Sequence, residues 1–328
     1  MADSTKVCVV GAGAVGGVLG GRLAAAGVPV SALARGATRD ALRTHGWRVD
    51  ASSSPVAAVS DDAADLGPQD VVIIAVKSHH LPALAPSLTP LITPSTVVVP
   101  ALNGVPWWFF HDFGGALEGT VLDATDPDRT VTAALPPSQV LGCVVHLAAD
   151  QAEPGHALLT AGDELIIGEP SGALSDRAGQ TAALLRTGGF RVTVSDAIQR
   201  DVWFKLWGNM TMNPISALTG ATADLVLDDP LVNAFIQRVM TEAAALGALI
   251  GAPIAQSAED RIAVTRRLGA FKTSMLQDAE SGRPIELDAL VTAVSEIGAR
   301  LAIPTPNIDA LLGLTRLAAR RRGLYSGA

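Results

Sequence analysis

Consecutive apolar residues alternate with helical segments along the first hundred positions of the chain. The apolar runs fall at residues 6–10, 28–33, 71–76 and 96–99. The run at residues 71–76 is apolar at every position and the run at 96–99 repeats this pattern, which is typical of parallel strands that are covered on both faces. Because the segments between them carry apolar residues at helical spacing, the pattern predicts a doubly wound parallel sheet.

The pattern changes at about Gly142. Short apolar segments at residues 143–147, 157–160 and 164–167 are separated by Gly, Pro and Asp, which is typical of antiparallel strands. We expect these strands to extend the sheet. A helix at 176–186 and a strand at 191–194 would then complete the first domain.

Helical spacing dominates the chain after Ser195, which is a favourable N-cap residue. The predicted helices cover residues 196–213, 230–249, 257–279, 286–301 and 306–322. The expected fold class is therefore α/β, with a doubly wound sheet and its antiparallel extension in a first domain and only helices in a second. We place these domains at residues 1–195 and 196–328.

Composition narrows the classes of function. Of the 328 residues, 48% are apolar and only 17% are charged, which is enough to fill two domain cores. The net charge of −8 argues against a nucleic-acid or anionic-membrane partner, because both require a basic surface. Cys8 and Cys143 have no metal-ligand spacing, so we expect neither a disulfide framework nor a metal site.

The sequence also lacks a pattern typical of membrane insertion. The uncharged stretch at residues 81–110 is long enough to cross a bilayer, but prolines interrupt it repeatedly. Glycines break the apolar run near the N-terminus, and no cleavage site typical of a signal peptide follows it. We therefore expect no membrane segment and a cytoplasmic protein.

A glycine motif follows the first apolar run at once, as Gly11-Ala12-Gly13-Ala14-Val15-Gly16, and a helical pattern follows the motif. Between a strand and a helix, G-x-G-x-x-G is typical of a Rossmann-like dinucleotide-binding domain. Gly11 permits the tight turn, Gly13 lets backbone N–H groups approach a pyrophosphate, and Gly16 lets the helix pack closely on the strand. We expect these glycines, with Ala14 at the positive end of the helix dipole, to bind a dinucleotide.

The end of the second predicted strand bears on the choice of cofactor. Enzymes specific for NAD place an acidic residue there, but residues 28–39 contain no Asp or Glu. Arg35 occupies the position instead, with Arg39 nearby. A cation suits a 2′-phosphate, so we predict NADPH as the cofactor; the alternative is that Arg35 is a solvated surface residue.

Two polar residues follow the next two strands. Lys77 ends the apolar run 71–76, and Asn103 precedes Gly104 after the run 96–99. Open α/β sheets bind ligands at the carboxyl ends of their strands, so both residues are candidate cofactor contacts. Taken alone, a solvated lysine and an Asn-Gly turn explain them equally well.

The helical half contains a second group of candidates. Lys205, Asn209 and Asn213 recur every four residues and therefore share one face of a helix. We expect Pro214 to end or kink that helix. Asn is a poor helix former, so two of them on one stripe favour a functional site over the solvated face of an amphipathic helix.

Taken together, these features resemble the ketopantoate reductase (2-dehydropantoate 2-reductase) family. The matching pieces are Gly11 to Gly16, Arg35, Lys77, Asn103-Gly104, Lys205 to Asn209, Asn213-Pro214, Ser274 to Asp278, Glu286 and Asp288. They keep the family's order from residue 11 to residue 288, so the resemblance covers nearly the whole chain. It implies an NADP-dependent oxidoreductase of pantothenate biosynthesis that reduces 2-dehydropantoate, a small 2-oxo acid, to pantoate.

The resemblance also implies a role for each residue. Lys205 would be the general acid and Glu286 a carboxylate that orients the substrate. This agrees with the chemistry, because hydride transfer to a 2-oxo carbonyl produces an alkoxide that needs a nearby cation and proton donor. The remaining residues would be binding contacts: Asn209, Asn213 and Ser274 for the substrate, and Arg35, Lys77 and Asn103 for the cofactor.

One feature of the sequence departs from the family pattern and leaves the identity of the substrate open. The aromatic run Trp107 to Phe110 could pack in a core, line the substrate pocket or form a homodimer contact. An aromatic wall would favour a paralogue that reduces a bulkier oxo acid, or one that condenses an oxo acid with an amine as opine dehydrogenases do. A non-catalytic NADPH sensor with the same fold is a further alternative. The helical half retains the polar residues that catalysis would need, and this argues against a non-catalytic sensor. These residues are Lys205, Asn209, Ser274 and Glu286.

Overall fold

A computed structural model describes residues 5–326, which divide into two compact units. Unit 1 comprises residues up to Leu102, Trp107–Phe113 and Asp126–Gln199. Unit 2 comprises Asn103–Pro106, Gly114–Thr125 and the chain from Arg200 onward. Two short segments of the first half of the chain therefore belong to the helical unit.

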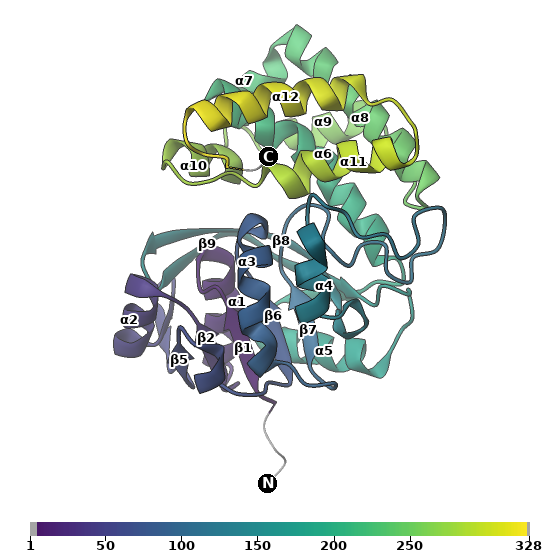
Figure 1. The fold of residues 1–328 in the computed structure, drawn as a ribbon. Helices are drawn as coiled ribbons and strands as arrows, with labels where there is room; N and C mark the ends of the chain where they lie inside the picture. Colours follow the sequence, from purple (N-terminus) through teal and green to yellow (C-terminus); the bar gives the residue numbers. More distant parts are fainter. Residues whose placement is uncertain (1–4, 327–328) are drawn as a thin grey trace. The chain divides into compact units, whose positions relative to one another are not determined.

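Five parallel strands form the main sheet of unit 1, in the order β5-β2-β1-β6-β7 (Figure 1). The strands are β1 (Val7–Val10), β2 (Val30–Leu33), β5 (Val59–Ser60), β6 (Val71–Ile74) and β7 (Val97–Pro100). The doubly wound parallel sheet predicted from the apolar runs is confirmed. Strand order reverses between β1 and β6, the position at which sheets of this kind bind ligands beyond their carboxyl ends.

Short helices complete unit 1. They are α1 (Ala14–Ala25), α2 (Gly36–His45), α3 (Leu81–Leu84), α4 (Thr130–Ala134) and α5 (Asp176–Thr187), together with the 3₁₀ turns η1 (Ala63–Asp65), η2 (Ser78–His80), η3 (Ala85–Leu91), η4 (Pro127–Arg129) and η5 (Pro137–Gln139). Figure 1 shows α3 and α4 over one face of the parallel sheet. Helix α1 also packs against β1 and β2. Burial of the sheet between these layers explains why β1, β6 and β7 contain no polar residue.

A second sheet covers α1 on the side away from the parallel sheet. It has the order β10-β9-β3-β4, with β8 paired to β9. Its strands are β3 (Trp47–Val49), β4 (Ser52–Ser54), β8 (Gly142–Glu153), β9 (His156–Gly168) and β10 (Arg191–Val194). The antiparallel pair that we predicted as an extension of the parallel sheet is the long hairpin β8-β9 of this separate mixed sheet. The added strands β3 and β4 have too few alternating apolar positions to be predicted.

Glycines allow α1 to lie between the two sheets. A Cβ on Gly20 would come within 2.5 Å of the Trp47 ring, and one on Gly21 within 2.3 Å of Val49. Residues of β1, α1, β3 and β9 share one buried core as a result. The helix is thus packed on both sides, and this explains its apolar, glycine-rich sequence.

The aromatic run belongs to the interior of unit 1. Trp107, Trp108, Phe109 and Phe110 are each at most 4% exposed. The indole Nε1 of Trp107 donates to the carbonyl of Leu135, 3.1 Å away. Because the chain itself covers these rings, they are core residues and cannot provide the homodimer contact considered above.

Unit 2 is helical. Its helices are α6 (Ile198–Thr219), which begins at the end of unit 1, α7 (Ala223–Asp228), α8 (Pro230–Leu249), α9 (Ala258–Arg266), α10 (Ser274–Glu280), η6 (Asp288–Thr292, a π-helix), α11 (Ala293–Arg300) and α12 (Pro306–Arg321). The single helix predicted at 257–279 is wrong, because Gly269 adopts a positive φ of 73° and Thr273 caps a new helix. The hydroxyl of Thr273 accepts from the Leu276 N–H in that cap.

Pro214 does not end its helix, so this one of its two predicted outcomes is wrong. α6 continues to Thr219, and Gly220 follows with a positive φ of 73°. Ile215 and Ala217, beyond the proline, are at most 5% exposed. Burial of these side chains offsets the backbone hydrogen bond that proline cannot donate.

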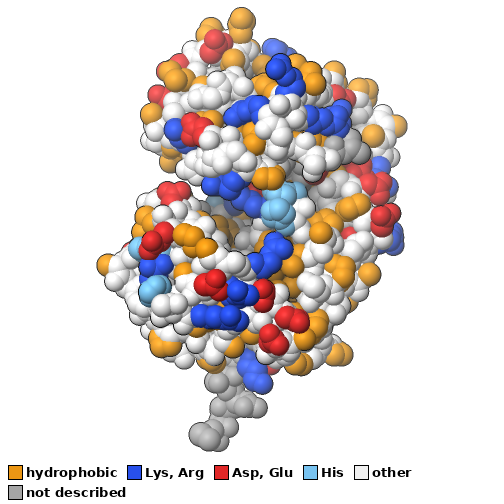
Figure 2. Space-filling view, turned by 60° about the vertical axis from the view of Figure 1, so that its left-hand side comes forward, with side chains coloured by type: hydrophobic (Ala, Val, Ile, Leu, Met, Phe, Trp, Pro, Cys, Tyr) orange, Lys and Arg blue, Asp and Glu red, His pale blue; other side chains and the backbone are white. Residues whose placement is uncertain are grey.

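The described residues contain no helix that is long and apolar enough to cross a membrane. Acidic and basic side chains are interspersed on the face of the molecule drawn in Figure 2.

Candidate active site

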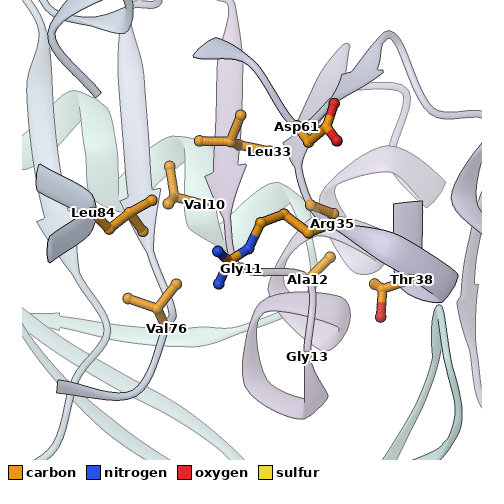
Figure 3. Close-up of a pocket in the computed structure, with 11 residues that line it drawn as sticks. Val10, Gly11, Ala12, Gly13, Leu33, Arg35, Thr38, Asp61, Val76 and Leu84 are labelled. Atoms are coloured by element: carbon orange, nitrogen blue, oxygen red, sulfur yellow. The ribbon is translucent and has the colours of Figure 1, made fainter. Parts of the chain in front are cut away.

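A cavity of about 320 Å³ opens in unit 1 at the carboxyl ends of β1 and β2 (Figure 3). It is lined by Val10, Gly11, Ala12, Gly13, Leu33, Ala34, Arg35, Thr38, Asp61, Val76 and Leu84. Three of the residues predicted to bind the cofactor, Gly11, Gly13 and Arg35, therefore line one cavity. Its walls are mostly apolar or backbone, with Arg35, Thr38 and Asp61 as the polar side chains, which suits a dinucleotide.

The glycine motif has the backbone geometry that its spacing predicts. Gly11 has a φ of +90°. A Cβ on Gly16 would lie 2.1 Å from the Gly11 carbonyl oxygen, so only glycine lets α1 start this close to β1. Gly13 is the N-cap of α1 and has open space around it, and Ala14 is the first residue of the helix. Unpaired N–H groups of this first turn can bind a pyrophosphate.

Arg35 is the N-cap residue of α2 and is exposed. Figure 3 shows its side chain extended across the cavity towards Gly11. Within residues 5–326 it makes no ion pair with a carboxylate. A cation without an acidic partner, at the N-terminus of a helix, can bind an anion such as a phosphate.

Arg39 is engaged elsewhere. Its Nη1 lies 2.5 Å from Oδ2 of Asp61, and its Nη2 lies 3.0 Å from Oδ1 of Asp40. The neighbouring carboxylates raise the pKa of Arg39, first through the hydrogen bond to Asp40. Asp61 was missed in the sequence, because the strand before it is only two residues long; a recognised third parallel strand would have indicated an acid at the carboxyl edge.

Lys77 follows β6 as the N-cap residue of η2 and is half-buried. Its neighbour Val76 lines the cavity. The position at the carboxyl edge of the sheet agrees with the sequence prediction, while a cofactor contact of Lys77 itself stays a prediction.

A second group of polar residues lies in unit 2. The ammonium Nζ of Lys205, on α6, donates to Oδ1 of Asn103 at 2.8 Å. Lys205 is half-buried, and Asn103 belongs to the segment 103–106 that joins unit 2. We predicted Asn103 as a cofactor contact, and the structure adds a direct partnership with the predicted general acid.

Backbone contacts hold Asn103 in place. Gly104 has a φ of +87°, and a Cβ there would lie 2.5 Å from the Ala289 carbonyl oxygen. The Val105 N–H donates to this same oxygen at 2.8 Å. Ala289 lies in η6, a π-helical segment of the kind that often occurs at functional sites. The sequence predicted an ordinary helix here and gave no signal for this docking.

The predicted substrate contacts lie on α6 and α10. Asn209 is half-buried and Asn213 is 7% exposed, one and two turns beyond Lys205 on the same helix. Ser274 is the exposed first residue of α10. A 2.5 Å hydrogen bond between the hydroxyls of Ser216 and Thr273 joins the two helices. The donors of α6 and the start of α10 are thus fixed relative to each other.

Glu286 is 7% exposed and lies two residues before η6. Hydrogen bonds and an ion pair hold the chain on either side of it. Nε of Arg283 contacts Oδ1 of the buried Asp278 at 3.0 Å, and the Arg283 N–H donates to the Asp278 carbonyl. The Tyr325 hydroxyl donates to Asp288 Oδ1 at 2.6 Å. These bonds restrict the backbone on both sides of Glu286.

Comparison with known proteins shows the family to which the chain is related. Residues 7–107 match the family model "Ketopantoate reductase PanE/ApbA", and residues 197–319 match its C-terminal model. A 2-dehydropantoate 2-reductase of Mesorhizobium japonicum is 42% identical over 98% of this chain and 100% of that protein. The chain belongs to the ketopantoate reductase family.

Solved structures agree with this assignment. A crystal structure assigned to the ketopantoate reductases, from Ralstonia solanacearum MolK2, has a TM-score of 0.93 and 56% identity, covering 98% of this chain and 99% of that one. D-mandelate dehydrogenase in complex with NADH and anilino(oxo)acetate has a TM-score of 0.82 at 18% identity, over 98% and 100% of the two chains, which shows a shared fold. The chain is therefore an oxidoreductase of the ketopantoate reductase family, with a Rossmann-like unit that implies a nicotinamide cofactor.

Proposed function

We propose that this protein reduces 2-dehydropantoate to pantoate with NADPH, and that Lys205 is the proton donor. The hydrogen bond of Lys205 to Asn103 carries the proposal. Asn103 follows the carboxyl end of β7 by three residues, and β7 belongs to the sheet whose edge forms the dinucleotide cavity. A short chain segment thus links the proton donor to the edge of the cofactor sheet.

The dinucleotide fits the cavity of unit 1. The first turn of α1 would receive the pyrophosphate, and Arg35 with Thr38 at the start of α2 would receive the 2′-phosphate. NADPH, when bound, supplies the hydride for the 2-oxo carbonyl. The 42% identical relative and the family model support the reaction class.

Lys205 then serves two purposes in the reaction. Its ammonium charge stabilises the negative charge that develops on the carbonyl oxygen, and one of its N–H bonds supplies the proton that converts the alkoxide to the hydroxyl. Asn103, as the acceptor of one N–H, restricts where the ammonium group of Lys205 lies. Asn103 is thus assigned to orient the proton donor, besides its predicted place at the cofactor.

Neutral donors and one acid would hold the substrate. Asn209, Asn213 and Ser274 can donate hydrogen bonds to a carboxylate without adding a group that titrates near pH 7. Glu286 can accept a hydrogen bond from a substrate hydroxyl. A hydroxylated 2-oxo acid such as 2-dehydropantoate uses all of these partners.

The test is the loss of NADPH absorbance with a panel of substrates. The panel holds 2-dehydropantoate, bulkier 2-oxo acids, and an oxo acid together with an amine. We expect the highest kcat/KM with 2-dehydropantoate, because the aromatic run that would favour a bulkier substrate is a core element. A higher kcat/KM with a bulky acid, or product formation only with the amine, would contradict the substrate. Cofactor binding without any turnover would indicate a sensor.

A further inference from the structure

The cofactor cavity contains an acid that should disfavour a phosphate. Asp61 lines the same cavity as Arg35 and Thr38. A free carboxylate there would repel a 2′-phosphate and would accept a hydrogen bond from the 2′-hydroxyl of NADH. The cavity thus carries the determinants of both cofactors, and their balance decides between them.

Arg39 forms an ion pair with Asp61. Its Nη1 lies 2.5 Å from the Asp61 carboxylate, and its Nε donates to Asp40 at 3.0 Å. In Figure 3 the Asp61 carboxylate is turned away from the Arg35 guanidinium. The pair joins α2 to the turn after β5, so it also fixes where the carboxylate points.

Arg35 and Arg39 are four residues apart, so they lie one turn apart along the same stretch of chain. Arg35 extends into the cavity and has no acidic partner within the described residues, whereas Arg39 has two. The two cations therefore have different functions, although they lie close together in the sequence.

We propose that Arg39 determines cofactor specificity indirectly: it binds and neutralises Asp61, so that a 2′-phosphate meets Arg35 and not the carboxylate. This rests on the NADPH preference proposed above. It makes Arg39 a positioning residue and makes Asp61 a latent determinant for NADH.

The experiment measures the dissociation constants of NADPH and NADH by fluorescence titration of the full chain. Arg39→Gln should weaken NADPH about fivefold to tenfold, the effect of one uncompensated like charge near the phosphate, and should leave NADH unchanged or tighter. Asp61→Asn in the same chain should restore NADPH binding. Arg39→Lys, which keeps the charge, should retain the preference for NADPH.

Arg43→Gln is the matched control. Arg43 lies one further turn along α2, where its guanidinium contacts a backbone carbonyl of Val59 at 3.5 Å, and it should leave both constants unchanged. If the Arg39→Gln loss persists in the double variant with Asp61→Asn, Arg39 acts by direct contact or by holding the fold, and the proposal is overturned. Arg35→Gln separates the two claims, because an unchanged NADPH constant in that variant removes the proposed NADPH preference itself.

Discussion

Single residues decide how the proposed proton donor is held. Sequence spacing predicted Lys205, Asn209 and Asn213 as a group, because helical periodicity places them on one face. The partnership of Lys205 with Asn103 could not be predicted, since it joins residues 102 positions apart through a turn that docks on another segment. Asp61 also escaped prediction, because local propensity does not indicate which loops form a common cavity wall.

The first prediction concerns Asn103→Asp. A carboxylate in hydrogen-bond contact with Lys205 would raise the pKa of the ammonium. The alkaline limb of the kcat/KM profile reports deprotonation of the proton donor, so this limb should move to higher pH. Asn103→Leu, of similar size but without the acceptor, is the control and should not move it upward. An unshifted limb in the aspartate variant would show that Lys205 is not the group that titrates.

At the scale of elements, the apolar pattern identified the parallel strands and most helices, because burial on both faces or on one face leaves a clear period. The apolar pattern did not predict the bounds or the type of a helix where backbone geometry determines them. α6 passes through Pro214, the segment predicted as one helix at 257–279 breaks at Gly269, and η6 is π-helical. Burial of the residues beyond Pro214 overrides local propensity in α6, whereas the break at Gly269 follows from its own positive φ and from the cap at Thr273.

Gly104→Ala tests the docking of the 103–106 turn on η6. The added methyl would meet the Ala289 carbonyl and would also strain a positive φ. Gly119→Ala is the matched control, since Gly119 also has a positive φ, of 68°, but has open space. We expect the control to lose about 1 kcal/mol of unfolding free energy and Gly104→Ala at least about 1 kcal/mol more. Equal losses in urea unfolding would contradict a close contact.

The C-terminal contact to η6 is tested through the only tyrosine of the chain. Burial, together with the hydrogen bond to Asp288, raises the pKa of Tyr325 to about 12. A raised pKa in the folded state means that this contact stabilises the fold fully below about pH 10, the ordinary tyrosine value, and that the stabilisation is lost as pH rises towards 12. Ultraviolet titration should find the tyrosinate transition near 12, and Asp288→Asn should lower it. A transition near 10 in the unmodified protein would contradict the contact.

At the scale of the whole molecule, the sequence predicted a Rossmann-like half and a helical half, and the family comparison confirms this fold. The pattern could not indicate that residues 103–106 and 114–125 belong to the helical unit, because their membership depends on long-range contacts such as those of Asp123 and Ala124 with Glu296. A homodimer stays a prediction, which light scattering of the purified protein can check.

We propose that Lys205 protonates a substrate that receives hydride from NADPH. Lys205→Met tests it most directly, with NADPH affinity and single-turnover reduction of 2-dehydropantoate measured on the same preparation. Methionine keeps an unbranched side chain of similar reach and removes the ammonium. We expect an NADPH dissociation constant within about twofold of the original and a turnover lower by about a hundredfold or more. Turnover at the original rate would contradict it.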